Sequence, residues 1–186
     1  MPQPFCFARN ALRQFSRNRR GSTAVEFALV APVFFALLFA IIETAMVFFA
    51  SQVLETVTQD AAREVMTGQA QGASYTKQQF KDYVCEHSSA LFDCANGIYI
   101  DIQNYPAFTD IKITAPVDAA KNFVNDMKYC PGKDGDIVVV RLFYQWPLFV
   151  TGLGYNVANL AGSKRLLTAT AAFRNEPFTG AAPPCS

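Results

Sequence analysis

Residues 17–42 read RNRRGSTAVEFALVAPVFFALLFAII, which is a basic stretch, one glycine and then a long apolar run. From Ser22 to Ile42 there are about 21 residues, or roughly 31 Å of α-helix, which matches the hydrocarbon core of a membrane. The run therefore predicts a membrane-spanning helix. Glu26 is its only charged residue. Because an unpaired carboxylate at the edge of a span costs a few kcal/mol, we expect Glu26 to serve a purpose.

The residues before the span predict its orientation. Five arginines precede it with no acidic residue among them, namely Arg9, Arg13, Arg17, Arg19 and Arg20. Positive residues that flank a span stay on the cytoplasmic side, so we expect the N-terminus inside and the bulk of the chain outside. Without these arginines the chain has 11 basic and 15 acidic residues, a net charge of about −4. Nucleic-acid binding is not expected, because it needs clustered positive charge.

Three interpretations of the apolar segment differ in its length and its processing. A secretory signal peptide has a shorter apolar core and a small-residue cleavage site, whereas this run continues with helical character to Ala50. A plain uncleaved anchor helix explains everything except the relative positions of Gly21 and Glu26. The third interpretation rests on that spacing, with glycine last in a charged leader, glutamate five residues later and Phe27 directly after it.

In this spacing the chain resembles the type IVb prepilins. The resemblance narrows to the TadE-like minor pseudopilins of tight-adherence (Tad) pilus systems through Glu26-Phe27-Ala28-Leu29-Val30-Ala31-Pro32, Glu43 and Phe173-Arg174-Asn175-Glu176-Pro177-Phe178. It implies that a membrane aspartyl prepilin peptidase cuts between Gly21 and Ser22. It also implies that Glu26 and Phe27 serve assembly, because the glutamate approaches the freed amino group of a neighbouring subunit.

The function implied by the resemblance is that of a minor pseudopilin in the assembly of a Tad-type (type IVb) adhesion pilus. Such a protein is single-pass in the bacterial inner membrane, with its N-terminus cytoplasmic and its C-terminal domain periplasmic. Its partners would be the inner membrane, the prepilin peptidase, other pilins or pseudopilins and the Tad secretion machinery. The alternative is an uncleaved, membrane-anchored periplasmic interaction or scaffold domain of an envelope secretion machine. The sequence leaves open whether the subunit belongs to the tip, the fibre or the membrane platform.

No enzymatic activity, cofactor or metal site is expected. The one histidine, His87, has no sequence pattern that links it to a nucleophile, and we expect it on the packed face of a helix. A zinc site is disfavoured because no CxxC pair is present. A calcium site in the turn Asp134-Gly135-Asp136 stays a less favoured alternative.

The cysteines divide across the membrane. Cys6 lies in the leader, on the reducing side, which leaves four cysteines in an oxidising compartment where disulfides persist. Four cysteines allow three pairings, and the sequence does not decide among them. We prefer Cys85 with Cys94, because a short loop can fold back from a helix end, and Cys130 with Cys185, which would tie the tail to the domain.

Periodicity predicts the organisation of the exported part. Beyond the span, apolar residues recur at helical spacing at Val47, Leu54, Val57, Ala61 and Val65. One helix therefore leaves the membrane and becomes amphipathic, ending near Gly68 before a loop over residues 67–74. We expect three parts, which are a basic leader over residues 1–21, the transmembrane and amphipathic helix over 22–67, and a periplasmic α+β domain over 68–186.

The remaining elements are one short helix and four candidate strands. The helix starts near Thr76, which can form a capping box with Gln79, and its buried stripe would be Phe80, Tyr83, Val84, His87 and Leu91. Alternating or continuous apolar patterns predict strands at Ile98–Gln103, Ile111–Ile113, Ile137–Trp146 and Leu166–Arg174, the third of them central. The economical architecture is a pilin-like α+β fold in which the long helix packs on a small antiparallel sheet.

Overall fold

The computed structural model describes residues 21–88, 91–150, 156–179 and 182–185. They form an α+β structure with a long N-terminal helix, α2 (Ser22–Met66), and a three-stranded antiparallel sheet, as the sequence predicts. The chain divides into two compact units, and the boundary lies inside α2, between Ile42 and Glu43. Except for Gly21, the expected leader with Cys6 lies outside the described residues.

The described part of the first unit is the beginning of α2. Its large apolar side chains are exposed by 37% to 73%. By length and composition, one helix in the described part of the chain can cross a membrane, and it is Thr23–Met66 within α2. This helix is compatible with a single-pass membrane anchor.

In the second unit, α2 becomes amphipathic and contributes to one hydrophobic core. The predicted stripe is buried, with exposed fractions of 6% or less at Val47, Leu54, Val57, Ala61 and Val65. Helical periodicity places these side chains on one face, so the sheet can cover them together. Thr58 lies on the same buried part and satisfies its hydroxyl by donating to the carbonyl oxygen of Leu54 at 2.7 Å.

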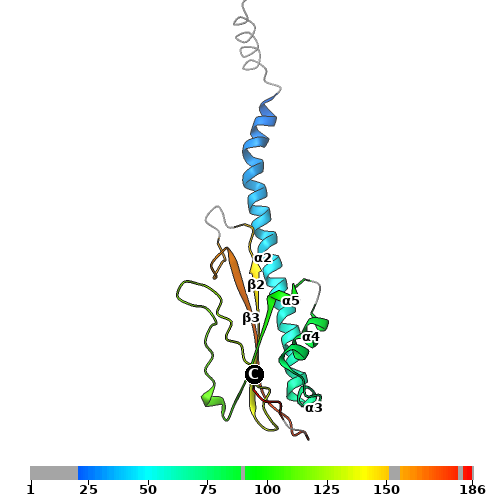
Figure 1. Ribbon diagram of the computed structural model, residues 1–186. Helices are drawn as coiled ribbons and strands as arrows, with labels where there is room; N and C mark the ends of the chain where they lie inside the picture. The colour runs from blue at the N-terminus through cyan, green and yellow to red at the C-terminus, as the bar shows by residue number, and fades with distance from the viewer. Residues whose placement is uncertain (1–20, 89–90, 151–155, 180–181, 186) are drawn as a thin grey trace, which may run out of the picture. The chain divides into compact units, whose positions relative to one another are not determined.

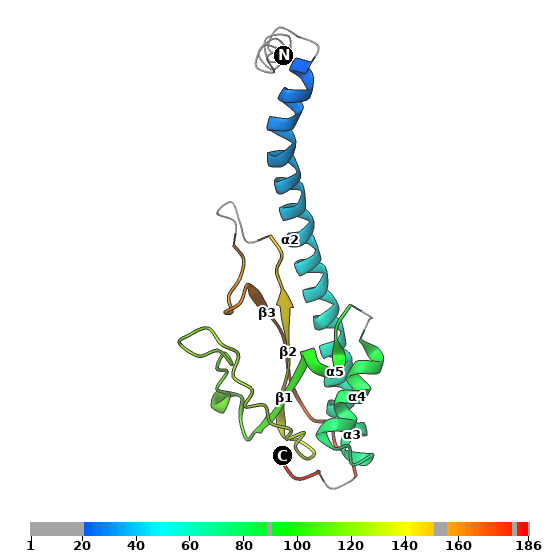
Figure 2. The same ribbon diagram turned by 45° about the horizontal axis from the view of Figure 1, so that its top comes forward.

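The sheet has the strand order β1-β2-β3, and all pairs are antiparallel. Its strands are β1 (Ile98–Tyr105), β2 (Ile137–Pro147) and β3 (Lys164–Arg174), so three of the four predicted strands are confirmed and β2 is central. Figures 1 and 2 both draw the part of α2 that belongs to the second unit running along the sheet. Alternate residues of β1, such as Ile100 and Ile102, are buried in the same core as the helix stripe.

The segment over residues 106–130, which contains the short 3-10 helix η2 (Phe108–Asp110) and is otherwise largely irregular, covers the other face of the sheet. Phe123 packs against Tyr99 and Phe143, with ring centroids 4.5 Å and 6.2 Å apart. The prediction of a strand at Ile111–Ile113 is wrong, because residues 111–115 have no regular structure and Ile113 is exposed. The free edge of β1 is bonded instead by the backbone of residues 128–130, through Ile102 N to Lys128 O and Cys130 N to Ile102 O, each 2.8 Å.

The connection after α2 differs from the predicted loop. A short helix, α3 (Gln69–Gly72), interrupts residues 67–74, and Ala70 and Gln71 are buried. The Gln71 side chain donates from Nε2 to the carbonyl oxygen of Pro131 at 3.0 Å, so this turn is held by a contact distant in the sequence. Sequence patterns carry no sign of such a contact.

The second predicted helix is present as α4 (Lys77–His87), and the capping box between Thr76 and Gln79 is confirmed. Phe80 and Val84 are buried, but the prediction that His87 packs on this stripe is wrong. His87 is exposed at the last position of the helix, where its ring nitrogen Nδ1 lies 2.8 Å from the carbonyl oxygen of Tyr83. Leu91 lies beyond the helix and is half-buried.

Two disulfides fasten the second unit. Cys85 in α4 pairs with Cys94 at the start of α5 (Cys94–Gly97), nine residues along the chain. Cys130 pairs with Cys185, 55 residues away, and so ties the C-terminal tail to the edge of β1. These are the two pairs preferred from the sequence. In the chain-entropy model each closed loop stabilises the fold by about 2 to 4 kcal/mol, the longer loop by more.

Candidate processing and assembly site

The predicted cleavage position lies at the start of α2. Gly21 immediately precedes the helix and is exposed, and a Cβ atom placed there would have nothing within 4 Å. No packing requirement in the described part of the chain therefore explains why this residue is a glycine. Ser22 is the first residue of α2.

Glu26 lies one helical turn after Ser22, on the same face of α2. It is exposed, as is its neighbour Phe27, and among the described residues no hydrogen bond or ion pair reaches its carboxylate. All other residues between Gly21 and Ile42 are uncharged. Over residues 21–42 the described chain thus presents one acid without a described partner in an otherwise apolar stretch, which in a membrane calls for a cation.

Glu43 has a different environment from Glu26, although both acids lie on α2. Its side chain is buried, and its carboxylate accepts hydrogen bonds from the backbone N–H groups of Phe149 and Val150, the latter at 3.1 Å. Glu43 therefore fastens the end of β2 to the helix. This role was not predicted, although an acid at the end of an apolar run was a signal for it.

The C-terminal motif Phe173–Phe178 meets the other end of α2. The backbone N–H of Glu176 donates to the carbonyl oxygen of Met66 at 2.9 Å, which satisfies a group that the end of a helix leaves unpaired. The Phe178 ring lies over Gly68, so closely that a Cβ atom at Gly68 would come within 2.3 Å of it. Asn175 is buried and donates from Nδ2 to the carbonyl oxygens of Pro131 and Lys133, each at 3.0 Å.

A comparison with known protein families finds a match in the region of α2. Residues 21–63 match the TadE-like protein family. The match begins at Gly21 and includes both Glu26 and Glu43, and it is consistent with a TadE-like protein of the Tad pilus system. No curated protein and no solved structure matches the chain. The TadE-like region indicates a Tad pilus-associated membrane protein, which would associate with the membrane and the pilus machinery.

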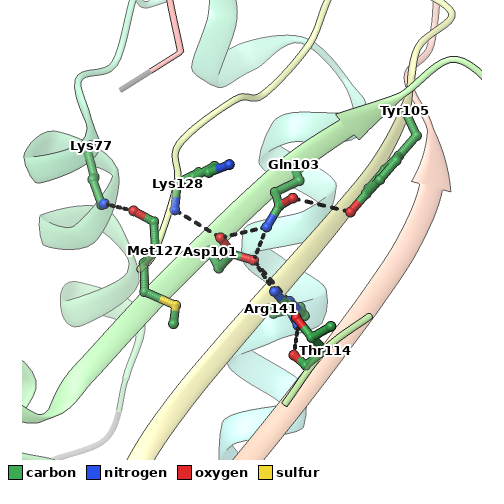
Figure 3. Close-up of polar contacts among 8 residues, drawn as sticks. All are labelled: Lys77, Asp101, Gln103, Tyr105, Thr114, Met127, Lys128 and Arg141. Carbon is green, nitrogen blue, oxygen red and sulfur yellow. Dashed lines mark hydrogen bonds and ion pairs between the residues drawn. The ribbon is translucent and has the colours of Figure 1, made fainter. Parts of the chain in front are cut away.

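The sheet and the segment over residues 106–130, which lie outside the TadE-like region, contain a buried polar network (Figure 3). Arg141 on β2 faces Asp101 on β1, and their side chains form a salt bridge of 2.6 Å at which both are buried. The network also includes Gln103, Lys128 and Thr114. The Asp101 carboxylate accepts from the Gln103 side chain and from the Lys128 N–H at 2.9 Å, and Arg141 donates to the Thr114 carbonyl oxygen at 2.8 Å.

This network has a structural role, because it joins β1 and β2 to the segment over residues 106–130. It was not predicted as a pair. The signals were an arginine inside the apolar run of β2 and an aspartate in the alternating pattern of β1. Nothing in either strand pattern says that residues 40 positions apart would meet.

The zinc and calcium sites, which the sequence disfavours, can be compared with the positions of the possible ligand side chains. Within the described residues no group of three or more histidine, cysteine, aspartate or glutamate side chains could hold a metal ion. In the turn Asp134-Gly135-Asp136, the Asp136 carboxylate is engaged in holding the turn. It accepts from the Lys133 N–H and from the Asn104 side chain, each at 3.1 Å.

Proposed function

We propose that the chain is a minor pseudopilin that takes part in assembling a Tad-type adhesion pilus. It is inserted in the bacterial inner membrane with its N-terminus in the cytoplasm and its second unit in the periplasm. The observation that carries the proposal is the exposed apolar first stretch of α2, residues 22–42, whose one charge is Glu26 and which begins beside Gly21, where the TadE-like match begins.

Processing follows from the position of Gly21. A peptidase that cuts between Gly21 and Ser22 needs an accessible backbone and a small residue at the cut, and the exposed glycine before α2 offers both. The cut removes the basic leader and frees an amino group at Ser22. The mature chain then carries a positive charge one helical turn from the Glu26 carboxylate.

Assembly follows from that charge. In the apolar interior of a membrane, an opposite charge on a neighbouring subunit compensates an acid that is otherwise costly to bury. Glu26 of one subunit therefore pairs with the freed amine of another, while exposed apolar side chains such as Phe27 supply the packing surface between helices.

Processing is tested by the intact mass of the protein extracted from membranes of a strain with an active prepilin peptidase. We expect wild type to be lighter than the full chain by the mass of residues 1–21. Gly21→Val should keep the full mass, because valine is too large for the cut. Gly72→Val is the matched control, since Gly72 is also exposed with nothing within 4 Å of a Cβ atom, and it should be processed normally.

A wild-type mass that still includes Met1 would contradict the processed pseudopilin. The uncleaved, membrane-anchored scaffold domain would then be the better description. Loss of pili after deletion of the gene, together with an unprocessed mass, would place that scaffold in the pilus machinery.

A further inference from the structure

The loop over residues 147–150, at the end of β2, exposes a large apolar side chain without an evident structural reason. Phe149 is 85% exposed, more than any other large apolar residue that the structure describes in the chain. Its neighbour Leu148 is buried, and the Leu148 N–H donates to the carbonyl oxygen of Ser163 at 2.9 Å. The backbone is therefore anchored directly beside an outward-facing phenylalanine.

A second anchor holds the same loop from the helix. The buried carboxylate of Glu43 accepts from the N–H groups of both Phe149 and Val150. A buried carboxylate is costly unless it is hydrogen-bonded, and here the backbone of the loop provides these bonds. Glu43 thus fixes Phe149 at the height of residue 43 along α2, one residue after the apolar run ends at Ile42.

Further exposed apolar residues of the second unit lie along the next turns of α2. Met46, Phe48 and Phe49 are exposed by 40%, 68% and 58%. With Phe149 they form an apolar collar, which we define as these four residues. Clusters of exposed large apolar side chains are rare on a surface that faces water, whereas they are common where a protein meets a bilayer interface.

Basic residues lie at the end of the sheet that carries this loop, where the Lys164 side chain donates to Gln145 Oε1 at 3.4 Å and the Arg165 side chain to the carbonyl oxygen of Val157 at 2.8 Å. Lys164 is paired with Pro147 in the sheet, and Arg165 follows it. The carbonyl oxygen of Lys121 accepts from the Ala161 N–H at 2.8 Å, which brings a third basic residue to the same end of the sheet. Of the acids nearby, Glu43 is buried, whereas the Asp118 carboxylate stays charged while it accepts from the N–H and the side chain of Asn122, so it offsets one of the three basic charges.

We propose that the loop over residues 147–150 rests on the bilayer that α2 enters, with the Phe149 ring inserted between the lipid headgroups. Lys121, Lys164 and Arg165 then face anionic phosphate headgroups. A lipid surface is the occupant that fits, because the collar starts where the span ends and joins apolar to basic side chains, the combination that binds anionic interfaces. The inference rests on the membrane anchor alone and not on processing or pilus assembly.

The proposal is tested on the full chain in lipid nanodiscs by tryptophan fluorescence. Trp146→Phe removes the one native tryptophan, and Phe149→Trp then places a reporter in the loop. Bromine on the upper acyl carbons of phosphatidylglycerol should quench this reporter at least twofold more than a matched reporter made by Phe108→Trp. Phe108 is 58% exposed and follows the far end of β1, so its reporter should stay in water and be quenched by acrylamide instead.

Two further variants test the anchors. Glu43→Gln removes the charge that attracts two N–H donors, so it should lower the bromine quenching at position 149 while the helix still inserts. The pair Lys164→Gln and Arg165→Gln should lower it in phosphatidylglycerol but not in phosphatidylcholine. Gly21→Val should leave the quenching unchanged, so failure of processing and failure of this proposal can be told apart.

Equal bromine quenching at positions 149 and 108 would overturn the proposal. So would a reporter at position 149 that is shielded from both bromine and acrylamide, because that result means a protein contact. A second measurement avoids the substitution of Trp146. A photoreactive phospholipid should label the wild-type peptide that contains residues 147–150 and not the one that contains Phe108, and absence of the label from residues 147–150 would also refute the contact.

Discussion

Asp101 and Arg141 form a salt bridge in which both side chains are buried. Removing two charges from water is costly, so such a pair is kept only where its other bonding groups are satisfied. Here most of these groups have hydrogen-bond partners, because Asp101 also accepts from Gln103 and Lys128, and Arg141 also donates to Thr114. The main role of the pair is therefore to hold the segment over residues 106–130 against the sheet, and the salt bridge itself adds little net stability.

Breaking one half of this pair should be more harmful than removing both halves. We expect Asp101→Ala to lower the free energy of unfolding by about 3 to 5 kcal/mol, because it leaves Arg141 charged and buried. The double variant Asp101→Leu and Arg141→Met should lose much less. Chemical unfolding of the detergent-solubilised chain, followed by circular dichroism, measures both. The exposed Asp134→Ala is the control, and equal losses in the single and double variants would show that the charge pair itself does not matter.

Tyr129 is a buried residue whose hydroxyl is unsatisfied within the described residues. Its hydroxyl has no hydrogen-bond partner in the part of the chain that the structure describes, and its ring packs on Phe80 with the centroids 5.6 Å apart. Burial, with a smaller contribution from Tyr75, raises the pKa of the Tyr129 phenol above its ordinary value. The folded state therefore holds the neutral form more strongly than the unfolded state does.

Tyr129→Phe should be at least as stable as wild type at pH 7, and its advantage over wild type should grow at alkaline pH, unlike the effect of an ordinary core truncation. At pH 7 we expect a gain of up to about 1 kcal/mol, because an unsatisfied buried hydroxyl is removed. With a raised pKa in the folded state, wild type keeps its full stability below about pH 10 and loses it as the pH rises further. The variant should lose less there. Unfolding free energies measured at pH 7 and pH 10.5 check this, and a larger alkaline loss in the variant would contradict it.

At the scale of elements, the patterns that depend on near neighbours were predicted well. The stripe of α2, the capping box of α4 and the strands β1, β2 and β3 each follow from periodicity or from residues a few positions apart. Features that depend on partners distant in the sequence were not predicted correctly. Ile111 and Ile113 alternate as a strand would, but the edge of β1 is already bonded by residues 128–130, so they find no strand to pair with.

The end of α2 shows how an element is limited by a partner far along the chain. Gly68 has a φ angle of 75°, which favours glycine, and the Phe178 ring covers it. Two independent constraints therefore exclude a side chain here. Only the first could be inferred from a glycine after a helix, because the second comes from the C-terminal motif.

Gly68→Ala should therefore destabilise the second unit by more than the cost of placing alanine in a left-handed backbone conformation. The backbone cost is about 1 kcal/mol, and displacement of the Phe178 ring adds a packing loss of about 1 to 3 kcal/mol. Gly72→Ala is the matched control, because Gly72 lies in α3 with nothing near a Cβ atom and should change stability by less than about 1 kcal/mol. Thermal unfolding of both variants gives the comparison, and equal melting temperatures would exclude the contact with Phe178.

For the whole molecule, the sequence predicted which residues belong to the candidate site, but only some of the contacts that these residues make. Gly21 directly precedes α2, and Glu26 lies five positions later in the first turns of that helix, so their relation follows from sequence alone. Glu43 meets a loop 106 residues away, and no local pattern reveals such a contact. The cleavage itself and the subunit contacts of Glu26 stay predictions, because both involve other proteins.

Glu26 can act in two ways that differ in their consequences for assembly. If it only complements the dipole at the start of α2, it contributes less than about 1 kcal/mol, and its loss affects one subunit alone. If it pairs with the freed amine of a neighbour, its loss leaves a positive charge without a partner in an apolar setting, and that cost falls on the contact between subunits.

We therefore expect Glu26→Ala to insert in the membrane, because the change removes a charge from the span, and yet to fail in association. The measurements are chemical crosslinking to pilin partners and a count of pili, with an intact mass to confirm that residues 1–21 are still removed. Glu26→Gln should fail as well, since it keeps the shape but not the charge, whereas the exposed Glu86→Ala on α4 should assemble normally. Normal crosslinking and normal pili in the Glu26→Ala strain would leave the helix dipole as the whole role of this residue, because a missing charge pair would have weakened every contact between subunits.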